Sequence, residues 1–479
     1  MLAGVLRLLT GQRSLEIVDL RQPCRPAKAA AARPAQEGSM IVLTGAAAVR
    51  DLAAQARAWR EALPLGGQVV VVVENRLRAR LAGMRHRVRR LFGRGSREAG
   101  GHPLRGPNLR EMRSALRSAG LACEHEFASY PSTRHPRELV PVSGRRDLLA
   151  PGHLLVARRL GEAEPVPLQV LVSTVQRAAA AQSPAVDWRV LRMSASEKHK
   201  SIVFIGDTVP LVVVRISHSM AAREAEARAH GLLRDLCSRP GASGLIPAPV
   251  CTGEIAGEPY FAERAVAGVP LAGLIGSDTR ASFVPAVESF LVGLNPPQSG
   301  YQESTARHRL DALQFAASIM ARVLPLVQSA AVRERAAAML EQSLAGVVCR
   351  AGLLHGDYGV NNILVSEGRL SGVIDWENAQ YAAPPVLDAF NYLDSVQRCC
   401  SDSMTLADTV PMLARGEWPI PDELALLRRA LARDGIEERY LRGFALLYWM
   451  RHLAAQLEFW GSDEALTQRV GAVLSRLPD

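Results

Sequence analysis

Two neighbouring stretches of this chain place charged and amide side chains inside segments that otherwise have the composition of buried strands. The first, LLHGDYGVNNILV, covers residues 353–365, and the second, GVIDWE, covers residues 372–377. Asp357 and Asn362 lie in the first stretch, and Asp375 ends the apolar run of the second. A buried polar group costs free energy unless it is hydrogen-bonded. The spacing therefore predicts a strand, a polar loop and further strands that bring these groups to one edge.

Two carboxylates and an amide on neighbouring loops are the groups that phosphoryl transfer requires. One aspartate near the acceptor hydroxyl can act as a base, while another aspartate and an asparagine hold Mg²⁺ on the triphosphate. Such catalysis is mainly positioning and charge stabilisation, so few groups suffice. Each residue alone is more often a satisfied buried polar group, but the joint pattern favours nucleotide-dependent phosphoryl transfer.

The paired motif, HGDYGVNNILV followed by GVIDWENAQ, resembles the catalytic loop and metal-binding motif of the aminoglycoside phosphotransferase and choline kinase family, which has the protein-kinase-like fold. The resemblance covers about residues 185–460. It implies that Asp357 is the catalytic base and that Asn362 and Asp375 are metal ligands. It also implies a supporting role for His355 inside the loop.

Two further positions of the motif bear on the class of kinase. The resemblance implies that Asp388, in PPVLDAFNYL, buttresses the catalytic loop from a helix. Gly356 stands where protein kinases carry an arginine that reads a phosphorylated activation loop. Its absence favours a small-molecule kinase without that switch.

Upstream segments resemble the nucleotide-binding lobe with departures. PLVVVRI (210–216) resembles the strand that normally carries a phosphate-binding lysine, but it has Arg215 in that place, and arginine keeps the charge without the shape. Glu224, or as an alternative Glu226, resembles the helix glutamate that pairs with this cation. We therefore expect a cation and a glutamate to meet in this lobe.

The loop and the hinge of this lobe supply further candidates. SASEKHK (194–200) lies where the nucleotide-covering loop is expected, and because it contains no glycine, Lys198 or Lys200 is expected to assist there. The segment from Glu263 to Ala265 resembles the interlobe hinge, whose backbone contacts adenine.

Candidate acceptor contacts lie on RYLRGFALLYWMRHLAAQLEFW (439–460), where Trp449, His452 and Gln456 mix aromatic and polar groups. Aromatic residues at helical spacing are more often core residues than a ligand site. No acidic cluster for a polycationic antibiotic is evident. A sugar or a cell-surface polysaccharide precursor is the acceptor that the N-terminal region favours by analogy.

Residues 39–160 alternate strand and helix patterns, including a Val-rich run typical of a strand buried on both faces. ALPLGGQVVVVVEN (62–75) and GPNLREMRSALRSAGL (106–121) resemble the second half of a class I S-adenosylmethionine-dependent methyltransferase. The glycine-rich turn that lets the backbone approach the cofactor is missing upstream. We expect an incomplete Rossmann-like domain with a structural or regulatory role.

Between these segments, residues 76–97 place apolar side chains on one helical face and arginines on the others. A solvated basic face packed on its own domain is the favoured interpretation. Contact with an anionic membrane surface or a polyanion is the alternative.

Composition narrows the remaining classes. Hydrophobic residues make up 48% and charged residues 22% of the chain, as in a globular protein. The seven cysteines lack metal-ligand spacing, which indicates a reducing cytoplasm and no structural zinc. No secretion signal is expected, and the longest apolar strand, residues 69–73, is too short to span a membrane. The net charge of +10 is spread widely and does not indicate nucleic-acid binding.

We therefore predict an α+β protein with a bilobal kinase-like domain. The predicted parts are a partial methyltransferase-like α/β domain at 1–160, a linker at 161–187, a β-rich N-lobe at 188–270 and a helical C-lobe at 271–479. The predicted activity is Mg²⁺-dependent transfer of the γ-phosphoryl group of ATP or GTP to a hydroxyl of a small acceptor. Two alternatives stay open: a non-catalytic pseudokinase scaffold that binds nucleotide or a partner, and a methyltransferase completed by another chain.

Overall fold

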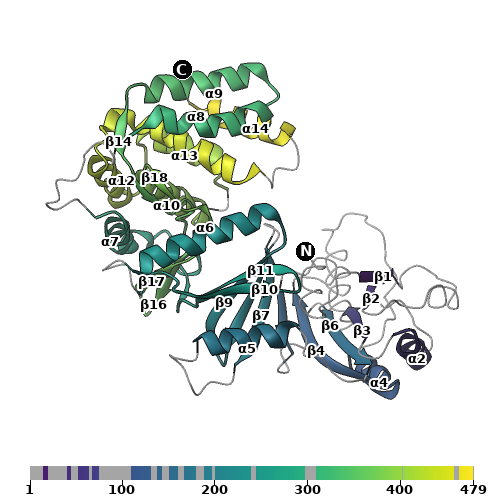
Figure 1. Cartoon of the computed structure of the whole chain (residues 1–479). Coiled ribbons are helices and arrows are strands. Elements are labelled where there is room, and N and C mark those ends of the chain that lie inside the picture. Colours follow the sequence, from purple (N-terminus) through teal and green to yellow (C-terminus); the bar gives the residue numbers. More distant parts are fainter. Residues whose placement is uncertain are drawn as a thin grey trace, which may run out of the picture. The chain divides into compact units, whose positions relative to one another are not determined.

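The computed structural model of the chain divides into two compact units, each built from two segments (Figure 1). Unit 1 comprises Met1–Glu226 and Val250–Ala265, and unit 2 comprises Ala227–Pro249 and Val266–Asp479. The structure describes residues 15–19, 40–44, 52–63, 67–74, 109–130, 138–142, 150, 152–159, 167–179, 188–196, 200–238, 244–296, 309–401, 403–457 and 463–477. The basic segment predicted at 76–97 lies outside these residues.

Unit 1 is organised around one mixed sheet of eleven strands. Its order is β1 (Leu15–Asp19), β2 (Met40–Thr44), β3 (Gln68–Glu74), β6 (Gly152–Arg159), β4 (Leu121–Tyr130), β5 (Glu138–Pro141), β7 (Arg189–Ser196), β8 (Lys200–Gly206), β9 (Pro210–Ser217), β11 (Glu258–Arg264) and β10 (Pro249–Ile255). The first three strands are parallel, and β6 runs antiparallel to both of its neighbours. The predicted strands at the N-terminus and in the N-lobe therefore belong to a single sheet.

The sheet continues across the predicted domain boundary through the pairing of β5 with β7. Glu138 lies opposite Ser194, and Leu139 lies opposite Met193. An ion pair of 3.2 Å between Arg192 and Glu138 accompanies this pairing. This architecture differs from the prediction of a domain at 1–160 followed by a separate N-lobe at 188–270.

Helix α5 (Pro167–Ala179) lies inside the segment predicted as a linker at 161–187. Its apolar side chains are buried in one core with side chains from strands on both sides of the β5–β7 junction. The buried helix residues are Leu168, Leu171, Val175 and Ala179. Residues 167–179 are therefore a packed element of unit 1, and their prediction as part of a linker is corrected.

Strand β3 explains why five valines follow one another. Val70 and Val72 belong to the core that α5 covers, whereas Val69, Val71 and Val73 belong to a second core on the opposite face. Helices α2 (Leu52–Ala62) and α4 (Leu109–Ser118) contribute to that second core. Burial on both faces requires apolar residues at every position, as the sequence pattern predicts.

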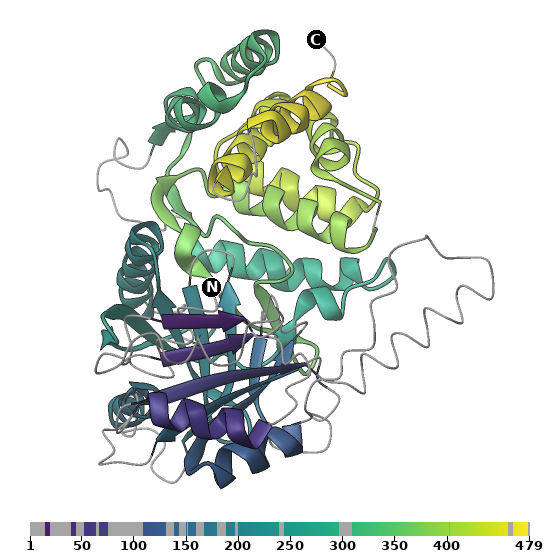
Figure 2. The same cartoon turned by 90° about the vertical axis from the view of Figure 1, so that its right-hand side faces the viewer.

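Helix α6 (Met220–Cys237) follows β9 and carries the chain from the first segment of unit 1 into unit 2. Most of unit 2 is helical (Figure 2). Its helices are α7 (Val284–Leu294), α8 (Ala312–Val323), α9 (Ala330–Leu344), α10 (Val386–Cys399), α11 (Leu406–Arg415), α12 (Pro421–Arg433), α13 (Leu441–Ala455) and α14 (Asp463–Leu474). Helices α10 and α13 run through the core and are buried on most of their sides.

Short strands in unit 2 hold the loop that carries the polar motif. The strands of the three small sheets are β12 (Val269–Pro270) with β16 (Ile363–Ser366) and β17 (Arg369–Val373), β13 (Arg309–Asp311) with β14 (Val348–Arg350), and β15 (Gly352–Leu354) with β18 (Gln380–Ala383). The loop of residues 355–362 connects β15 to β16 and is therefore anchored at both ends.

In the part of the chain that the structure describes, no helix is long and apolar enough to cross a membrane.

Candidate active site

The backbone of the polar loop is held by Asp388, which lies in the first turn of α10. Its carboxylate accepts the N–H of His355 at 2.7 Å and the N–H of Gly356 at 2.9 Å. Burial raises the pKa of Asp388 to about 7, although these two bonds act in the opposite direction. The start of the loop is thus fixed to the core helix at the position where the resemblance places a buttress.

His355 connects the loop to the end of β17. Its Nδ1 accepts the N–H of Asp357 at 3.3 Å, so its Nε2 carries the proton and donates to the carbonyl of Ile374 at 3.1 Å. The ring is fully buried, its centroid lies 4.5 Å from that of the Trp376 ring in a T-shaped arrangement, and burial lowers its pKa to about 4. His355 is therefore a neutral residue that fixes the spacing of two loops.

Asp357 and Asn362 are in direct contact. The Asn362 Nδ2 donates to the Asp357 carbonyl at 2.9 Å and to the Asp357 carboxylate at 3.1 Å. A tight turn, with the Gly359 N–H donating to the same carbonyl at 2.8 Å, closes the loop between them. Because the amide nitrogen faces Asp357, the Asn362 Oδ1 is the atom turned toward other partners.

Asp375 lies at the same end of the β16–β17 hairpin as Asn362. Ile363 pairs with Val373, and the Ile374 N–H donates to the Asn362 carbonyl at 2.9 Å. Asp375 itself has a φ of 67°, in the left-handed region. A residue other than glycine pays about 1–3 kcal/mol for such a conformation, which persists mostly at functional sites.

The oxygen donors of Asn362 and Asp375 fit Mg²⁺, which takes one or two carboxylates from the protein and completes its shell with phosphates and water. Among the described residues, no group of three or more His, Cys, Asp or Glu side chains lies together as a metal centre. The pair would hold an ion together with the phosphates of a nucleotide.

Arg451 is a part of this site that the sequence analysis missed. From α13, its Nη1 donates to the Gly356 carbonyl at 2.7 Å and its Nη2 donates to the Asn378 carbonyl at 2.8 Å. One guanidinium thus joins the loop of Asp357 to the segment that follows Asp375. Burial lowers the pKa of Arg451, while Asp388 and Asp357 act to raise it.

The Arg451 contact also explains Gly356. This glycine has a φ of 83°, and a Cβ there would overlap the Arg451 guanidinium and the Asn378 carbonyl oxygen. The position therefore requires glycine whatever residue other kinases carry in it.

We expect Arg451→Met to lower the melting temperature by several degrees, because each carbonyl left without its donor costs about 1–3 kcal/mol when buried. Arg451→Lys should recover part of the loss, since an ammonium lacks the fork that spans both carbonyls. The control is Arg439→Met, whose side chain is 67% exposed.

Gly356→Ala should cost less in the Arg451→Met background than in the wild type, since part of the overlap disappears. Additive costs, or an unchanged melting temperature for Arg451→Met, would contradict this role. Differential scanning calorimetry of the single and double variants measures both quantities.

The two cations predicted in unit 1, Lys200 and Arg215, pair with other carboxylates than the predicted Glu224. The Lys200 Nζ lies 2.9 Å from a carboxylate oxygen of Glu226, and both side chains are buried. Arg215 donates to Glu263 at 2.8 Å and lies 3.9 Å from Glu226. Glu224 is exposed. The choice of Glu224 is therefore corrected in favour of Glu226, because only Glu226 lies on the face of α6 that meets the cations.

Three nucleotide-lobe candidates remain to be placed. Lys198 lies outside the described residues, so its role stays a prediction. The Ala265 N–H donates to the Leu211 carbonyl at 2.9 Å, which extends the pairing of β11 with β9 by one residue. This amide is therefore paired within unit 1, and the Glu263 side chain contacts Arg215. The adenine contact of the backbone from Glu263 to Ala265 stays a prediction.

The acceptor candidates on α13 separate into core and surface residues. Trp449 is 1% exposed and packs in the core, so its prediction as a substrate contact is wrong. His452 and Gln456 are partly exposed. Burial, with Arg398, Arg451 and Arg469 nearby, lowers the pKa of His452 to about 4. His452 and Gln456 stay candidates for acceptor contact.

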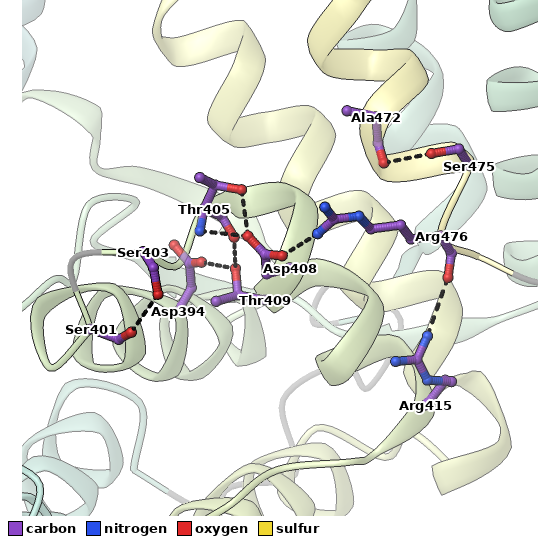
Figure 3. A network of polar contacts seen from close by, with 10 residues as sticks. All are labelled: Asp394, Ser401, Ser403, Thr405, Asp408, Thr409, Arg415, Ala472, Ser475 and Arg476. Atoms are coloured by element: carbon purple, nitrogen blue, oxygen red, sulfur yellow. Dashed lines mark hydrogen bonds and ion pairs between the residues drawn. The ribbon is translucent and has the colours of Figure 1, made fainter.

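A polar network joins α10 to α11 through Asp394 and Thr409 (Figure 3), and Asp394 also contacts α13. The fully buried carboxylate of Asp394 on α10 accepts the hydroxyl of Thr409 on α11 and the hydroxyl of Tyr448 on α13, the latter at 2.7 Å. Thr405 and Asp408 cap α11 reciprocally, with the Thr405 N–H donating to Asp408 at 2.8 Å. These bonds hold together three helices, including the one that carries Arg451.

Comparison with known proteins supports phosphoryl transfer. Residues 196–401 match the family model of the phosphotransferase enzyme family. This match assigns phosphotransferase chemistry to that part of the chain. It begins at residue 196, so the methyltransferase resemblance upstream gains no support. Among curated proteins, none matches the chain by sequence.

Solved structures of similar shape include an apo thermostable mutant of aminoglycoside phosphotransferase APH(4)-Ia, with 18% identity over 63% of this chain and 98% of the other, at a TM-score of 0.40. ADP-bound aminoglycoside phosphotransferase APH(2'')-Ib shows 14% identity over 64% of this chain and 97% of the other, at a TM-score of 0.42.

Proposed function

We propose that this protein transfers the γ-phosphoryl group of ATP or GTP to a hydroxyl of a small molecule. The observation that carries the proposal is the placement of Asp357, Asn362 and Asp375 at one end of a short hairpin. Asp357 accepts the proton of the acceptor hydroxyl while the oxygen of that hydroxyl bonds to the γ-phosphorus. The bond between the β- and γ-phosphates breaks, and the nucleoside diphosphate leaves.

Asn362 has two functions in this proposal. Its Nδ2 orients the Asp357 carboxylate, and its Oδ1 binds Mg²⁺ together with Asp375. The ion, when bound, neutralises charge on the phosphates. His355, Asp388 and Arg451 fix the loops so that the carboxylates need little reorganisation.

The acceptor in this proposal is a neutral or weakly charged hydroxyl compound such as a sugar or a cell-surface polysaccharide precursor. The buried environment of α13 lowers the pKa of His452 to about 4, so this residue contributes no cation and no anion at neutral pH.

The test is the melting temperature with and without Mg²⁺ and millimolar ATP or GTP. A ligand that binds only the folded state at 100 times its dissociation constant adds about 2.7 kcal/mol of stability. We expect a metal-dependent increase for the wild type, no increase for Asp375→Asn, and a normal increase for the control Asp422→Asn, which alters an exposed carboxylate.

No increase with either nucleotide would overturn the proposal. An increase without transfer to any compound of a broad panel of sugars and alcohols would identify a nucleotide-binding scaffold instead. A separate increase with S-adenosylmethionine would support the methyltransferase alternative.

A further inference from the structure

The pairing of Lys200 with Glu226 places an unexpected residue beside the helix glutamate. In protein kinases a lysine on a strand pairs with a glutamate on the following helix, and both must be in place for phosphoryl transfer. Here β9 precedes α6 and supplies Arg215, yet the residue at 2.9 Å from Glu226 is Lys200, the first residue of β8.

The register of the two strands explains how Lys200 reaches this position. In the antiparallel pairing of β8 with β9, Lys200 lies opposite Ser217 and Ile202 lies opposite Arg215. Side chains two residues apart on a strand project to the same face. Lys200 and Arg215 are therefore diagonal neighbours on one face, and both face Glu226.

The two cations are held by different carboxylates. Arg215 directs its Nε and Nη2 to a single oxygen of Glu263 on β11, at 3.2 Å and 2.8 Å. Lys200 is held by Glu226. The exposed fractions of the four side chains range from 3% to 11%, so each charge depends on its partners.

The two cations differ in the hydrogen-bond donors that each can offer to a phosphate. A lysine ammonium has three donors and can serve Glu226 and a phosphate oxygen together, whereas Arg215 already directs two donors of its rigid fork to Glu263. Lys200 is also the last residue of the glycine-free stretch SASEKHK (194–200), so this stretch ends on a cation.

We propose that Lys200 on β8 is the cation that binds the nucleotide phosphates, that Glu226 holds it, and that Arg215 is a positioning residue that acts through Glu263. This inference rests on the proposed function. The inference assigns phosphate binding to β8 instead of β9, the strand that directly precedes α6.

The experiment compares Lys200→Met with Arg215→Met in the full chain. For Lys200→Met we expect phosphoryl turnover to fall about 100-fold, the typical effect of removing one donor to the developing charge, and ATP affinity to weaken. For Arg215→Met we expect less than about a fivefold loss of turnover, together with a lower melting temperature. Turnover is measured as Mg²⁺-dependent formation of ADP from ATP, and affinity by titration calorimetry.

A relocation variant makes the test sharper. In Lys200→Met/Arg215→Lys the lysine stands on the strand next to the helix, where it should pair with Glu226 and restore part of the turnover lost in Lys200→Met. Glu226→Gln should weaken ATP binding to a similar extent as Lys200→Met. Failure of both expectations would overturn the inference.

Other outcomes also decide the question. A 100-fold loss for Arg215→Met with normal turnover for Lys200→Met would make Arg215 the phosphate-binding cation. Should Lys200→Met fail to fold, Lys200→Arg decides, since we expect it to fold and to lose at least about tenfold in turnover because of its shape. If wild type shows no nucleotide effect, the proposed function itself fails; normal nucleotide binding in wild type and Lys200→Met alike overturns only this inference.

Discussion

Asp357→Asn is expected to lower phosphoryl turnover by about 10²–10⁴-fold, the range that a general base contributes. The asparagine has the same size and its Oδ1 can still accept from Asn362, which now bonds the carboxylate at 3.1 Å. An amide, however, cannot take the proton of the acceptor hydroxyl. Turnover should therefore fall while the loop keeps its geometry.

The metal-dependent increase in melting temperature distinguishes this variant from Asp375→Asn. Asp357→Asn should keep the increase with Mg²⁺ and nucleotide, because Asn362 and Asp375 remain, whereas Asp375→Asn should lose it. Turnover close to that of the wild type in Asp357→Asn would remove this residue from the role of base. Loss of nucleotide binding in the same variant would indicate that its carboxylate belongs to the metal site.

The geometry around Asp357 could be predicted from sequence because it is local. Asn362 directly precedes β16, and one residue separates Asp375 from the end of β17. A hairpin of two short strands therefore brings them together. Nothing beyond the spacing and the strand pattern is required. The role of each residue came from the resemblance rather than from the spacing.

The cation pairing of unit 1 could not be predicted in the same way. Glu224 and Glu226 differ by two positions, which on an α-helix is a rotation of about 200°, so only one can face the sheet. The rotation of α6 depends on packing that no local pattern specifies. The choice of Lys200 depends likewise on strand register and on how β8 meets the helix.

Contacts between residues far apart in the sequence could not be predicted from it either. Arg451 reaches Gly356 across 95 positions of sequence. In the sequence it is an arginine in an apolar helix, a residue that usually extends its charge to solvent. The pairing of β5 with β7 joins segments whose patterns suggested separate domains. The amino-acid composition of a strand does not identify the strand with which its edge will pair.

The largest effect on stability is expected at Arg280, whose ion pair with Glu423 is buried. Its Nε and Nη2 donate to the two carboxylate oxygens at 2.7 Å and 2.5 Å, and the side chains are 4% and 0% exposed. Gln397 and Trp418 complete the hydrogen bonds of the pair. Removing one partner of a buried pair leaves an uncompensated charge and costs about 3–5 kcal/mol.

The matched control is the pair of Arg429 with Glu288, which has the same two-bond geometry, at 2.8 Å and 2.6 Å, but is 52% and 23% exposed. Arg429→Met should cost less than about 1 kcal/mol, because solvent screens the pair. The two arginines thus test burial with the chemistry of the contact held constant.

Arg280→Met should lower the melting temperature by about 10 °C, whereas Arg429→Met should lower it by no more than about 3 °C. Arg280→Met/Glu423→Gln should be more stable than Arg280→Met alone, because the glutamine is uncharged and its oxygen can still accept from Trp418. Thermal unfolding followed by circular dichroism measures all three variants. Equal losses for the two single variants would show that burial does not govern the stability of these pairs, and a double variant less stable than Arg280→Met would show that the Glu423 charge is stabilising without its arginine.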